Sequence, residues 1–434
     1  MAKFKNFRYI VIALSTIIFL VSYMDRVNLS IAVLQIGPEF HLSTVEIGLL
    51  SSMFFVGYMI FQIPGGIWTE KYGPRKIMTL AFSWWTTFTI LMSAGISFAY
   101  ILTVRTFFGF GEAPLFPGNG NLYARWLRKD EQTIGWSWSL AGMGLGPILG
   151  TIFSTYIMLN YGWQWIFIIF GVIGFFVAIG FYAVVKDMPE ESKYVSKEEI
   201  EKINSSYKDP KNERGKTTKE YAPWKKLIAS GRFWAYGFTH FISSYVVYGF
   251  LTLLPLYLVV SRHFSKASLY WTGTMPWVAF IIAMLVGGYF IDKALSKGYT
   301  LFKAKAIPSS IAFFLAAIFL ILGAYSPTPI LVVMWLSFGL AMQGIHGISV
   351  WSLGANMAPK FSGSYGGFMN TVATSAGIIA PILTTVIATY LGWDSAIAFM
   401  GILCIIGAIL WLVMKPDKSF VPDLIPSYVP ETQK

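Results

Sequence analysis

The chain has few charged residues for its length. Asp, Glu, Lys and Arg make up 12% of its 434 residues, whereas 55% are hydrophobic. A soluble domain carries about 25% charged residues, so this composition excludes an ordinary soluble protein and indicates an integral membrane protein whose partner is the lipid bilayer. The net charge of +12 predicts no nucleic-acid partner, because we expect nearly all of it in loops on one membrane face.

Cysteine and the common catalytic motifs are also nearly absent. The single cysteine, Cys404, lies in a late apolar run, which excludes a disulfide framework and a cysteine metal site. The sequence contains no phosphate-binding loop, no H-E-x-x-H motif and no nucleophile elbow. We therefore expect neither an enzyme nor ATP-driven transport, and no metal or organic cofactor.

Long apolar runs fill the chain instead. A spanning helix needs about 20 mostly apolar residues. The segments that fit are 9–30, 44–68, 77–95, 98–122, 132–157, 164–185, 233–259, 269–292, 304–324, 328–351, 363–390 and 394–414. We predict an all-α membrane protein with 12 transmembrane helices. The first run resembles a signal peptide, but it ends in Y-M-D-R without a small-residue cleavage site, so we interpret it as an uncleaved first helix.

Basic residues recur in every second connection between these segments. They are Lys3, Lys5, Arg8, Lys71, Arg75, Lys76, Arg125, Arg128, Lys129, those of the stretch 186–232, Lys293, Lys297, Lys303, Lys305, Lys360, Lys415 and Lys418. The intervening connections contain only Arg262 and Lys266. The positive-inside rule then places both termini in the cytoplasm. We expect a multi-pass protein of the plasma (inner) membrane.

One long hydrophilic connection, residues 187–232, divides the chain. It separates an N-terminal six-helix bundle, residues 1–186, from a C-terminal six-helix bundle with a short cytoplasmic tail, residues 233–434. Its mixed charges predict a short amphipathic or solvated helix and a linker, and they favour a solvated spacer over a functional segment. Both halves contain a G-x-x-x-acid-base motif, at residues 66–71 and 288–293. Paired halves are typical of a rocking transporter with its site near the midplane.

Two charges interrupt the apolar segment 98–122. Arg105 and Glu112 lie seven residues apart, which is two helical turns, so both should point to the same face. Because a charge at this depth costs about 2.5–3.5 kcal/mol, it usually marks an ion or substrate pathway. A purely structural Arg–Glu pair is the alternative. Pro114 and Pro117 should make this helix bendable.

A second pair of charges, Asp25 and Arg26, lies deep in the first helix. Neighbouring helical residues point about 100° apart, so the two cannot face the same partner. The alternative is a local ion pair that silences both charges. Arginine stays protonated and suits a carboxylate, whereas a carboxylate can change its protonation state. We therefore expect an arginine to bind an anion and acids to carry protons. We also expect four phenylalanines to surround Glu112, namely Phe107, Phe108, Phe110 and Phe116.

Several motifs resemble a known family. The loop after residue 66 resembles the signature loop of the major facilitator superfamily, with Glu70-Lys71 in place of the usual Asp-Arg. The segments YMDRVNLS (23–30), RTFFGFGEAPLFPGN (105–119) and GGFMN (366–370) are similar to the anion:cation symporter family. That family includes bacterial hexuronate, glucarate and galactonate carriers and sialin. The resemblance spans the whole chain and implies two pseudo-symmetric six-helix bundles.

The resemblance also implies roles for individual residues. Arg26 and Asn370 would bind substrate, and Asp25 and Glu112 would couple protons, with Arg105 acting on Glu112. From their chemistry, Tyr23 and Tyr58 can supply hydroxyls to a polyol or carboxylate, and the alternative is that they are ordinary interhelical residues. His240 is a further candidate substrate contact, or else a packing residue, with His346 and Gln343 as weaker candidates. The expected gating loops carry Glu70, Lys71, Arg75, Lys76 and Asp292.

The function that these features favour is uptake of a small organic anion coupled to protons. We expect a monomer that carries a sugar acid, a hexuronate or an aldonate, by alternating access, with the proton as the coupling ion. An anion or phosphate exchanger stays possible, because residues 142–150 (GMGLGPILG) resemble the glycine-proline motif of antiporters. The other interpretation of these glycines is close helix packing. A sensor with a transporter fold is a further alternative.

Overall fold

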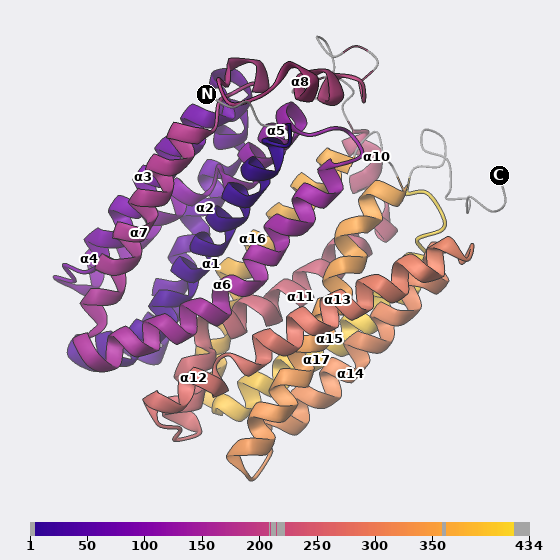
Figure 1. The fold of residues 1–434 in the computed structure, drawn as a ribbon. Coiled ribbons are helices and arrows are strands. Elements are labelled where there is room, and N and C mark those ends of the chain that lie inside the picture. The colour runs from indigo at the N-terminus through magenta and orange to yellow at the C-terminus, as the bar shows by residue number, and fades with distance from the viewer. Residues whose placement is uncertain (1–4, 208, 210–213, 215–221, 358–361, 421–434) are drawn as a thin grey trace. The chain divides into compact units, whose positions relative to one another are not determined.

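Helices make up most of the part of the chain that the structure describes. The computed structural model describes residues 5–207, 209, 214, 222–357 and 362–420 (Figure 1). Within these ranges every regular element is a helix. Lys3 and Lys360, which contribute to the predicted charge alternation, lie outside the described residues.

The chain forms two compact units. The first contains Met1–Leu42 and Met53–Thr218, and the second contains Ser43–Ser52 and Lys219–Lys434. The first unit holds α1 (Arg8–Glu39), most of α2 (Thr44–Tyr72), α3 (Pro74–Met92), α4 (Phe98–Glu112), α5 (Leu115–Trp126), α6 (Gln132–Tyr161), α7 (Trp163–Val184), η1 (Pro189–Glu191) and α8 (Lys197–Asn204). The division between the units after Thr218 falls inside the predicted linker 187–232.

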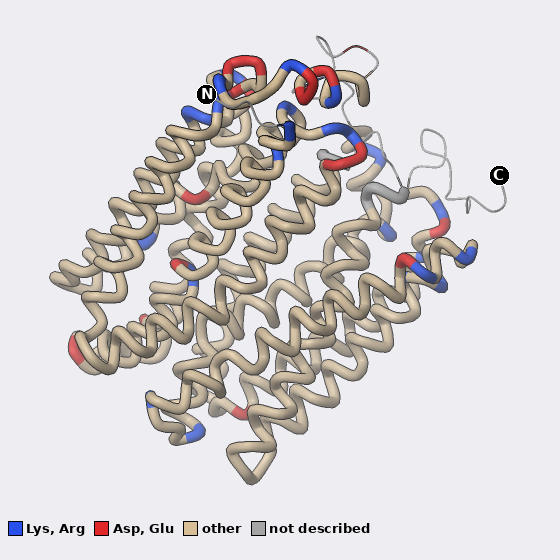
Figure 2. The backbone as a smooth tube through the Cα atoms, in the orientation of Figure 1, with Lys and Arg blue, Asp and Glu red and all other residues tan. Residues whose placement is uncertain are grey.

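The second unit has the remaining helices. They are the start of α2, α10 (Trp224–Ile228), α11 (Gly231–Leu256), η2 (Tyr257–Ser261), η3 (Lys266–Ser268), α12 (Leu269–Thr272), α13 (Met275–Ser296), η4 (Phe302–Ala306), α14 (Ile307–Ala324), α15 (Pro329–Met357), α16 (Ser362–Leu391) and α17 (Trp393–Met414). In each unit most charged residues lie at helix ends, and few lie midway along a helix (Figure 2).

Ten of the predicted spans reappear as single apolar segments. Among the described residues, ten helical segments are long and apolar enough to cross a membrane. The other two predicted spans, 77–95 and 98–122, correspond to α3 and to α4 with α5. The second of these is not one helix, because α4 ends at Glu112 and α5 begins at Leu115. Pro114 lies at the break, in agreement with the prediction that the prolines make this segment bendable.

Glycines let α1 and α6 pack closely. A Cβ on Gly146 would lie 2.5 Å from Cβ of Tyr23, and one on Gly150 would lie 3.0 Å from Cα of Met24. A Cβ on Gly142 would meet the Thr16 carbonyl oxygen. Gly142, Gly146 and Gly150 therefore form a helix-packing surface. Their presence is explained by packing and needs no exchange mechanism.

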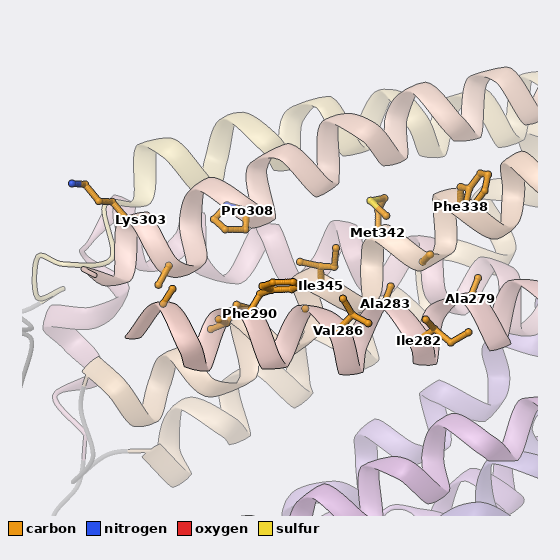
Figure 3. Close-up of a pocket in the computed structure, with 15 residues that line it drawn as sticks. Ala279, Ile282, Ala283, Val286, Phe290, Lys303, Pro308, Phe338, Met342 and Ile345 are labelled. Carbon is orange, nitrogen blue, oxygen red and sulfur yellow. The ribbon is translucent and has the colours of Figure 1, made fainter. Parts of the chain in front are cut away.

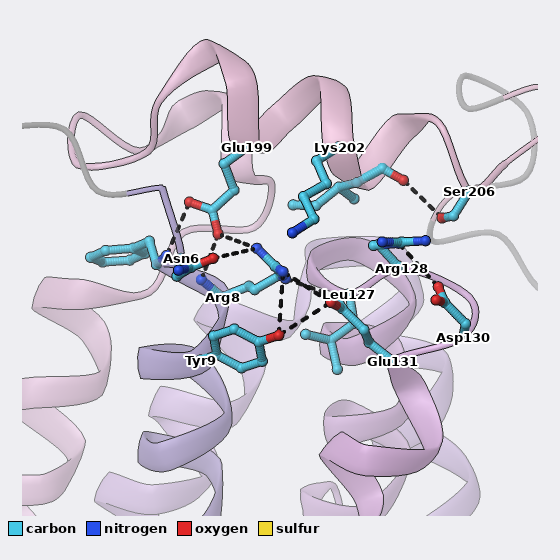
Figure 4. A network of polar contacts seen from close by, with 12 residues as sticks. Asn6, Arg8, Tyr9, Leu127, Arg128, Asp130, Glu131, Glu199, Lys202 and Ser206 are labelled. Carbon is cyan, nitrogen blue, oxygen red and sulfur yellow. Dashed lines mark hydrogen bonds and ion pairs between the residues drawn. The ribbon is translucent and has the colours of Figure 1, made fainter.

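The linker contains the short helix that its composition predicts, α8, but its first part is not a solvated spacer. Residues 189–207 belong to the first unit and lie against its other helices (Figure 4). Glu199 of α8 is buried and accepts hydrogen bonds from the backbone N–H groups of Phe7 and Arg8, both at 3.0 Å. The N-terminal N–H groups of a helix lack partners within the helix and favour an anion. Glu199 thus acts as a cap for α1 supplied by the linker.

Arg8 joins this cap to a second acid. Its guanidinium donates to both oxygens of Glu131, at 2.8 and 2.9 Å, and lies 3.2 Å from Oε1 of Glu199. Burial raises the pKa of Glu131, but the hydrogen bonds and charge of Arg8 outweigh this effect, so the pKa lies below its ordinary value. The Tyr207 hydroxyl adds a further anchor by donating to the Leu127 carbonyl oxygen at 2.9 Å. The start of α1, the α5–α6 connection and α8 are therefore fastened together.

Candidate functional site

A buried ion pair joins the first and fourth predicted spans. Arg26 of α1 and Glu112 of α4 are 3% and 0% exposed, and Arg26 Nε donates to Glu112 Oε1 at 3.0 Å. The Ser22 hydroxyl, one turn earlier on α1, donates to the same oxygen. The other oxygen, Glu112 Oε2, is buried and has no hydrogen-bond partner among the described residues. The pair is thus satisfied on one side of the carboxylate.

Aromatic rings surround the Arg26 guanidinium. Its Cζ lies 4.4 Å from the ring centre of Tyr23, 4.9 Å from that of Phe54 and 5.2 Å from that of Tyr58. Arg26 Nη1 also donates to the Tyr23 hydroxyl at 3.4 Å. A cation over an aromatic face is attracted by the ring's electrons. Tyr23 and Tyr58 therefore both lie beside Arg26. Their ring faces, and not only their hydroxyl groups, contact the guanidinium.

Arg105, which lies midway along α4, contacts the same position on α1. Its Nη2 donates to the Arg26 carbonyl oxygen at 3.4 Å, and its Cζ lies 5.2 Å from the Phe54 ring and 4.8 Å from the Phe108 ring. Arg105 and Glu112 thus lie on one face of α4, as their spacing predicts. In this structure Glu112 pairs with Arg26, and the described residues include no Arg105–Glu112 ion pair.

The side chain of Asp25 contacts a different partner from that of Arg26, its neighbour in the chain. It is 1% exposed and accepts a hydrogen bond from Asn28 Nδ2 at 3.3 Å. Among the described residues no ion pair joins Asp25 to Arg26, so the structure lacks the local pair that would silence both charges. The two residues face different partners because adjacent helical positions diverge by about 100°.

The expectation that four phenylalanines surround Glu112 is wrong for two of them. Phe107 stacks on Phe88 of α3, with ring centres 5.3 Å apart, and Phe110 stacks on Phe61 of α2 at 4.5 Å. Because residues within one turn point to different sides of a helix, neighbours of Glu112 in the sequence contact different helices.

Glycines set the close approach of α2 and α4 at this site. A Cβ on Gly109 would meet the Phe54 carbonyl oxygen, and a Cβ on Gly57 would meet that of Thr106. The two helices therefore touch through their backbones. At this contact Phe54 lies beside both Arg26 and Arg105, and Tyr58 lies beside Arg26. Phe54 and Ser22 are site residues that the sequence reasoning missed. Phe54 lies one turn before Tyr58, so a helical spacing rule applied to Tyr58 could have found it.

The second unit contains a buried polar cluster of its own. The rings of His240 (α11) and His346 (α15) lie 6.0 Å apart, and His240 lies 5.3 Å from the Trp351 ring. His346 Nδ1 accepts a hydrogen bond from Trp411 at 2.9 Å. Neither ring nitrogen of His240 has a hydrogen-bond partner among the described residues. Of the two weaker candidates, His346 thus lies beside His240, whereas Gln343 donates a hydrogen bond to Cys404 Sγ at 3.5 Å. Asn370 lies on α16 and is partly exposed.

The predicted gating residues lie at helix ends. The Arg75 backbone N–H donates to Asp187 Oδ1 at 2.9 Å, and its guanidinium donates to the Tyr182 carbonyl oxygen at 2.8 Å. Gly73, with φ +90°, permits this turn, since a Cβ there would meet the Asp187 carboxylate. The α2–α3 connection is thus fastened to the end of α7. The other four predicted residues are exposed, namely Glu70, Lys71, Lys76 and, in the second unit, Asp292.

Comparisons with known proteins give matches to one family of membrane transporters. The model described as the Major Facilitator Superfamily matches residues 15–381. The chain is 27% identical to the probable galactarate/D-glucarate transporter GarP of Escherichia coli (strain K12), covering 94% of this chain and 95% of that protein. It is 28% identical to the chloroplastic ascorbate transporter of Arabidopsis thaliana, covering 93% and 74%.

Two further similarities cover almost the full length. The probable sulfoacetate transporter SauU of Cupriavidus necator is 25% identical, and the match covers 94% of each chain. A crystal structure of a bacterial homolog to the human lysosomal transporter Spinster, inward-facing and unoccupied, superposes with a TM-score of 0.78. It is 14% identical and covers 95% of this chain and 98% of that one. This last likeness concerns the fold alone.

Proposed function

Because this chain belongs to the Major Facilitator Superfamily, we propose that it carries a small organic anion across a membrane in symport with protons. The family and the relatives are transporters, so the chain is a transporter and not an enzyme. The relatives' names refer to galactarate or D-glucarate, ascorbate and sulfoacetate, which are all small anions. We propose a sugar acid, a hexuronate or an aldonate, as the substrate.

The observation that supports this proposal is the buried Arg26–Glu112 pair. While Glu112 is deprotonated, it occupies the guanidinium that a substrate carboxylate would need. Once Glu112 is protonated, it is neutral and no longer competes for Arg26. The planar guanidinium can then bind the substrate carboxylate with two parallel hydrogen bonds. A proton and an anion are therefore bound together.

The same competition provides the release step. If the proton leaves Glu112, the carboxylate again attracts Arg26 and repels the bound anion. Two negative charges beside one buried guanidinium are unfavourable, because charges interact strongly where water is excluded. Asp25, also buried, is the second proton carrier in the proposal. Arg105, which lies against the Arg26 carbonyl, would keep the local charge balanced while Glu112 changes its protonation state.

Further contacts would recognise the rest of the substrate. We propose that the Tyr23 and Tyr58 hydroxyls and the side chains of Asn370 and His240 bind its hydroxyl groups. We also propose alternating access, with loops carrying Glu70, Lys71, Arg75, Lys76 and Asp292 as gates. The protein would act as a monomer in the plasma membrane, with both termini in the cytoplasm.

Transport by purified protein in liposomes tests the proposal. A labelled sugar acid, such as glucuronate, galactarate or gluconate, is offered outside, and an inward proton gradient is imposed. Symport predicts accumulation that a protonophore abolishes. Uptake that needs an internal anion and ignores the gradient would show an exchanger. Binding without uptake under either condition would show a sensor, and both results contradict the proposal.

A further inference from the structure

A groove in the second unit lies between α13 and α15. Its volume is about 610 Å³. The residues that line it are Ala279, Ile282, Ala283, Val286, Gly287, Phe290, Ile291, Ala294, Lys303, Ala304, Pro308, Phe338, Ala341, Met342 and Ile345. Figure 3 shows Lys303 at one end of the groove and Ala279 and Phe338 at the other. None of these residues takes part in the proposed transport site.

Small residues on α13 form the groove. Ala279, Ala283 and Gly287 follow one another at a spacing of four, so they lie on one face of the helix. Across the groove, α15 presents the larger side chains of Met342 and Ile345. A Cβ on Gly287 would lie 3.2 Å from Cγ1 of Ile345, so the helices touch there. Where the facing residues are alanines, a furrow is left between them.

The side chains along the groove are exposed and apolar. Ile282 is 56% exposed, Val286 50% and Phe290 61%, and all three lie on a helical segment that is apolar enough to span a membrane. Exposed apolar side chains at this depth face hydrocarbon. Among the described residues that line the groove, every side chain is apolar except Lys303. An acyl chain matches this lining, and a polar solute does not.

The charge at one end of the groove restricts the occupant further. Lys303 is exposed, and its ammonium has no ion-pair partner among the described residues. Lys293 and Lys297, near the same end of α13, are also exposed, and they outnumber the neighbouring acid Asp292. Basic pockets at the ends of spanning helices favour anionic head groups. The occupant therefore needs an apolar chain and a negatively charged head.

The length of the groove suits one acyl chain. From Ala279 to Ala294 the helix rises about 22 Å. Half of a typical hydrocarbon core is about 15 Å thick, so the groove is long enough to hold one acyl chain along its length. We propose that this groove binds an anionic phospholipid, with one acyl chain along α13 and the phosphate at Lys303. The site is independent of the proposed transport function, because it shares no residue with it.

Native mass spectrometry of the purified, delipidated protein tests the proposal. Phosphatidylglycerol and phosphatidylcholine with identical acyl chains are titrated separately. The wild type should bind phosphatidylglycerol more tightly. Lys303→Gln should weaken phosphatidylglycerol binding about fivefold, the typical effect of one basic residue near an anionic surface, and leave phosphatidylcholine binding unchanged. Lys202→Gln, which removes an exposed charge from α8, is the matched control and should bind like the wild type.

A second variant tests the chain-binding part of the groove. Ala283→Phe should weaken binding of both lipids, because the ring occupies the furrow, and Ala341→Leu fills it from α15 if the first variant does not fold. Equal affinity for the two lipids would overturn the proposal, as would wild-type binding by Lys303→Gln. Displacement of phosphatidylglycerol by inorganic phosphate would also overturn it, since that result indicates a site for free anions.

Discussion

Arg26 holds Glu112 by a single carboxylate oxygen, Oε1, while the buried Oε2 lacks a hydrogen-bond partner in the described part of the chain. A fully paired carboxylate would be stabilised in its charged form by every contact. A half-paired one is held less firmly, because an unpaired buried oxygen costs free energy. The ion pair is therefore suited to open when a proton arrives. In the paired state, the guanidinium also lies over the rings of Tyr23 and Phe54.

The role of Arg26 can be tested by a change that keeps its charge. Arg26→Lys should weaken binding of a sugar acid about tenfold or more, because a charged hydrogen bond contributes about 1.5–3 kcal/mol and an ammonium cannot replace the planar fork. Calorimetry on the purified protein measures the affinity. Arg128→Lys, at a partly exposed ion pair with Asp130, is the control. Unchanged affinity in Arg26→Lys would remove Arg26 from the site.

The second unit is tested by Asn370. Asn370→Ala should weaken binding by about fivefold or more, since a bound polar group left unpaired costs about 1–3 kcal/mol. Asn160→Ala, at the exposed end of α6, provides the control. Thermal stabilisation by substrate gives the readout, because at a fixed ligand concentration a ligand with a larger Kd stabilises the folded state less. A folded Asn370→Ala protein with wild-type stabilisation would show that Asn370 does not bind substrate.

Helical periodicity explains how much of this site could be predicted. The face shared by Arg105 and Glu112 follows from their spacing alone, and so does the separation of Asp25 from Arg26. The partner of Glu112 could not be predicted, because Arg26 lies 86 residues earlier and reaches it only where α1 packs on α4. Likewise, composition shows that the linker is charged but does not show that Glu199 binds Arg8, 191 residues away.

The docked linker predicts a difference between two adjacent acids. Glu199→Gln should lower the melting temperature and speed hydrogen exchange in residues 189–207, since breaking a buried ion pair costs about 3–5 kcal/mol. Glu198→Gln is the matched control, because Glu198 pairs with Lys5 on the surface, where such pairs contribute about 0–1 kcal/mol. Equal exchange rates in the two variants would mean that Glu199 does not hold the linker.

The same network predicts a dependence on pH. The pKa of Glu131 is lower in the folded protein than its ordinary value of 4.5. Its contribution to stability is therefore complete above that value and is lost as the pH falls through the lower, folded-state pKa. Exchange in residues 189–207 should rise as the pH is lowered through this range, after correction for intrinsic exchange. Glu131→Gln should show high exchange at every pH. A wild-type profile in that variant would contradict the prediction.

Coupling itself is tested by Glu112→Gln, which resembles the protonated carboxyl group at every pH. The amide carries no negative charge, so Arg26 should stay available and the variant should bind substrate at least as tightly as the wild type. It should also exchange labelled for unlabelled substrate across liposomes, because neither step requires net proton movement. Accumulation driven by a proton gradient should be lost. If the variant concentrates substrate like the wild type, the proton is carried elsewhere, and Asp25→Asn becomes the next test. Loss of binding in a folded Glu112→Gln protein would make Glu112 a ligand or a structural residue. The competition between Glu112 and substrate for Arg26 would then be wrong, whatever the cargo.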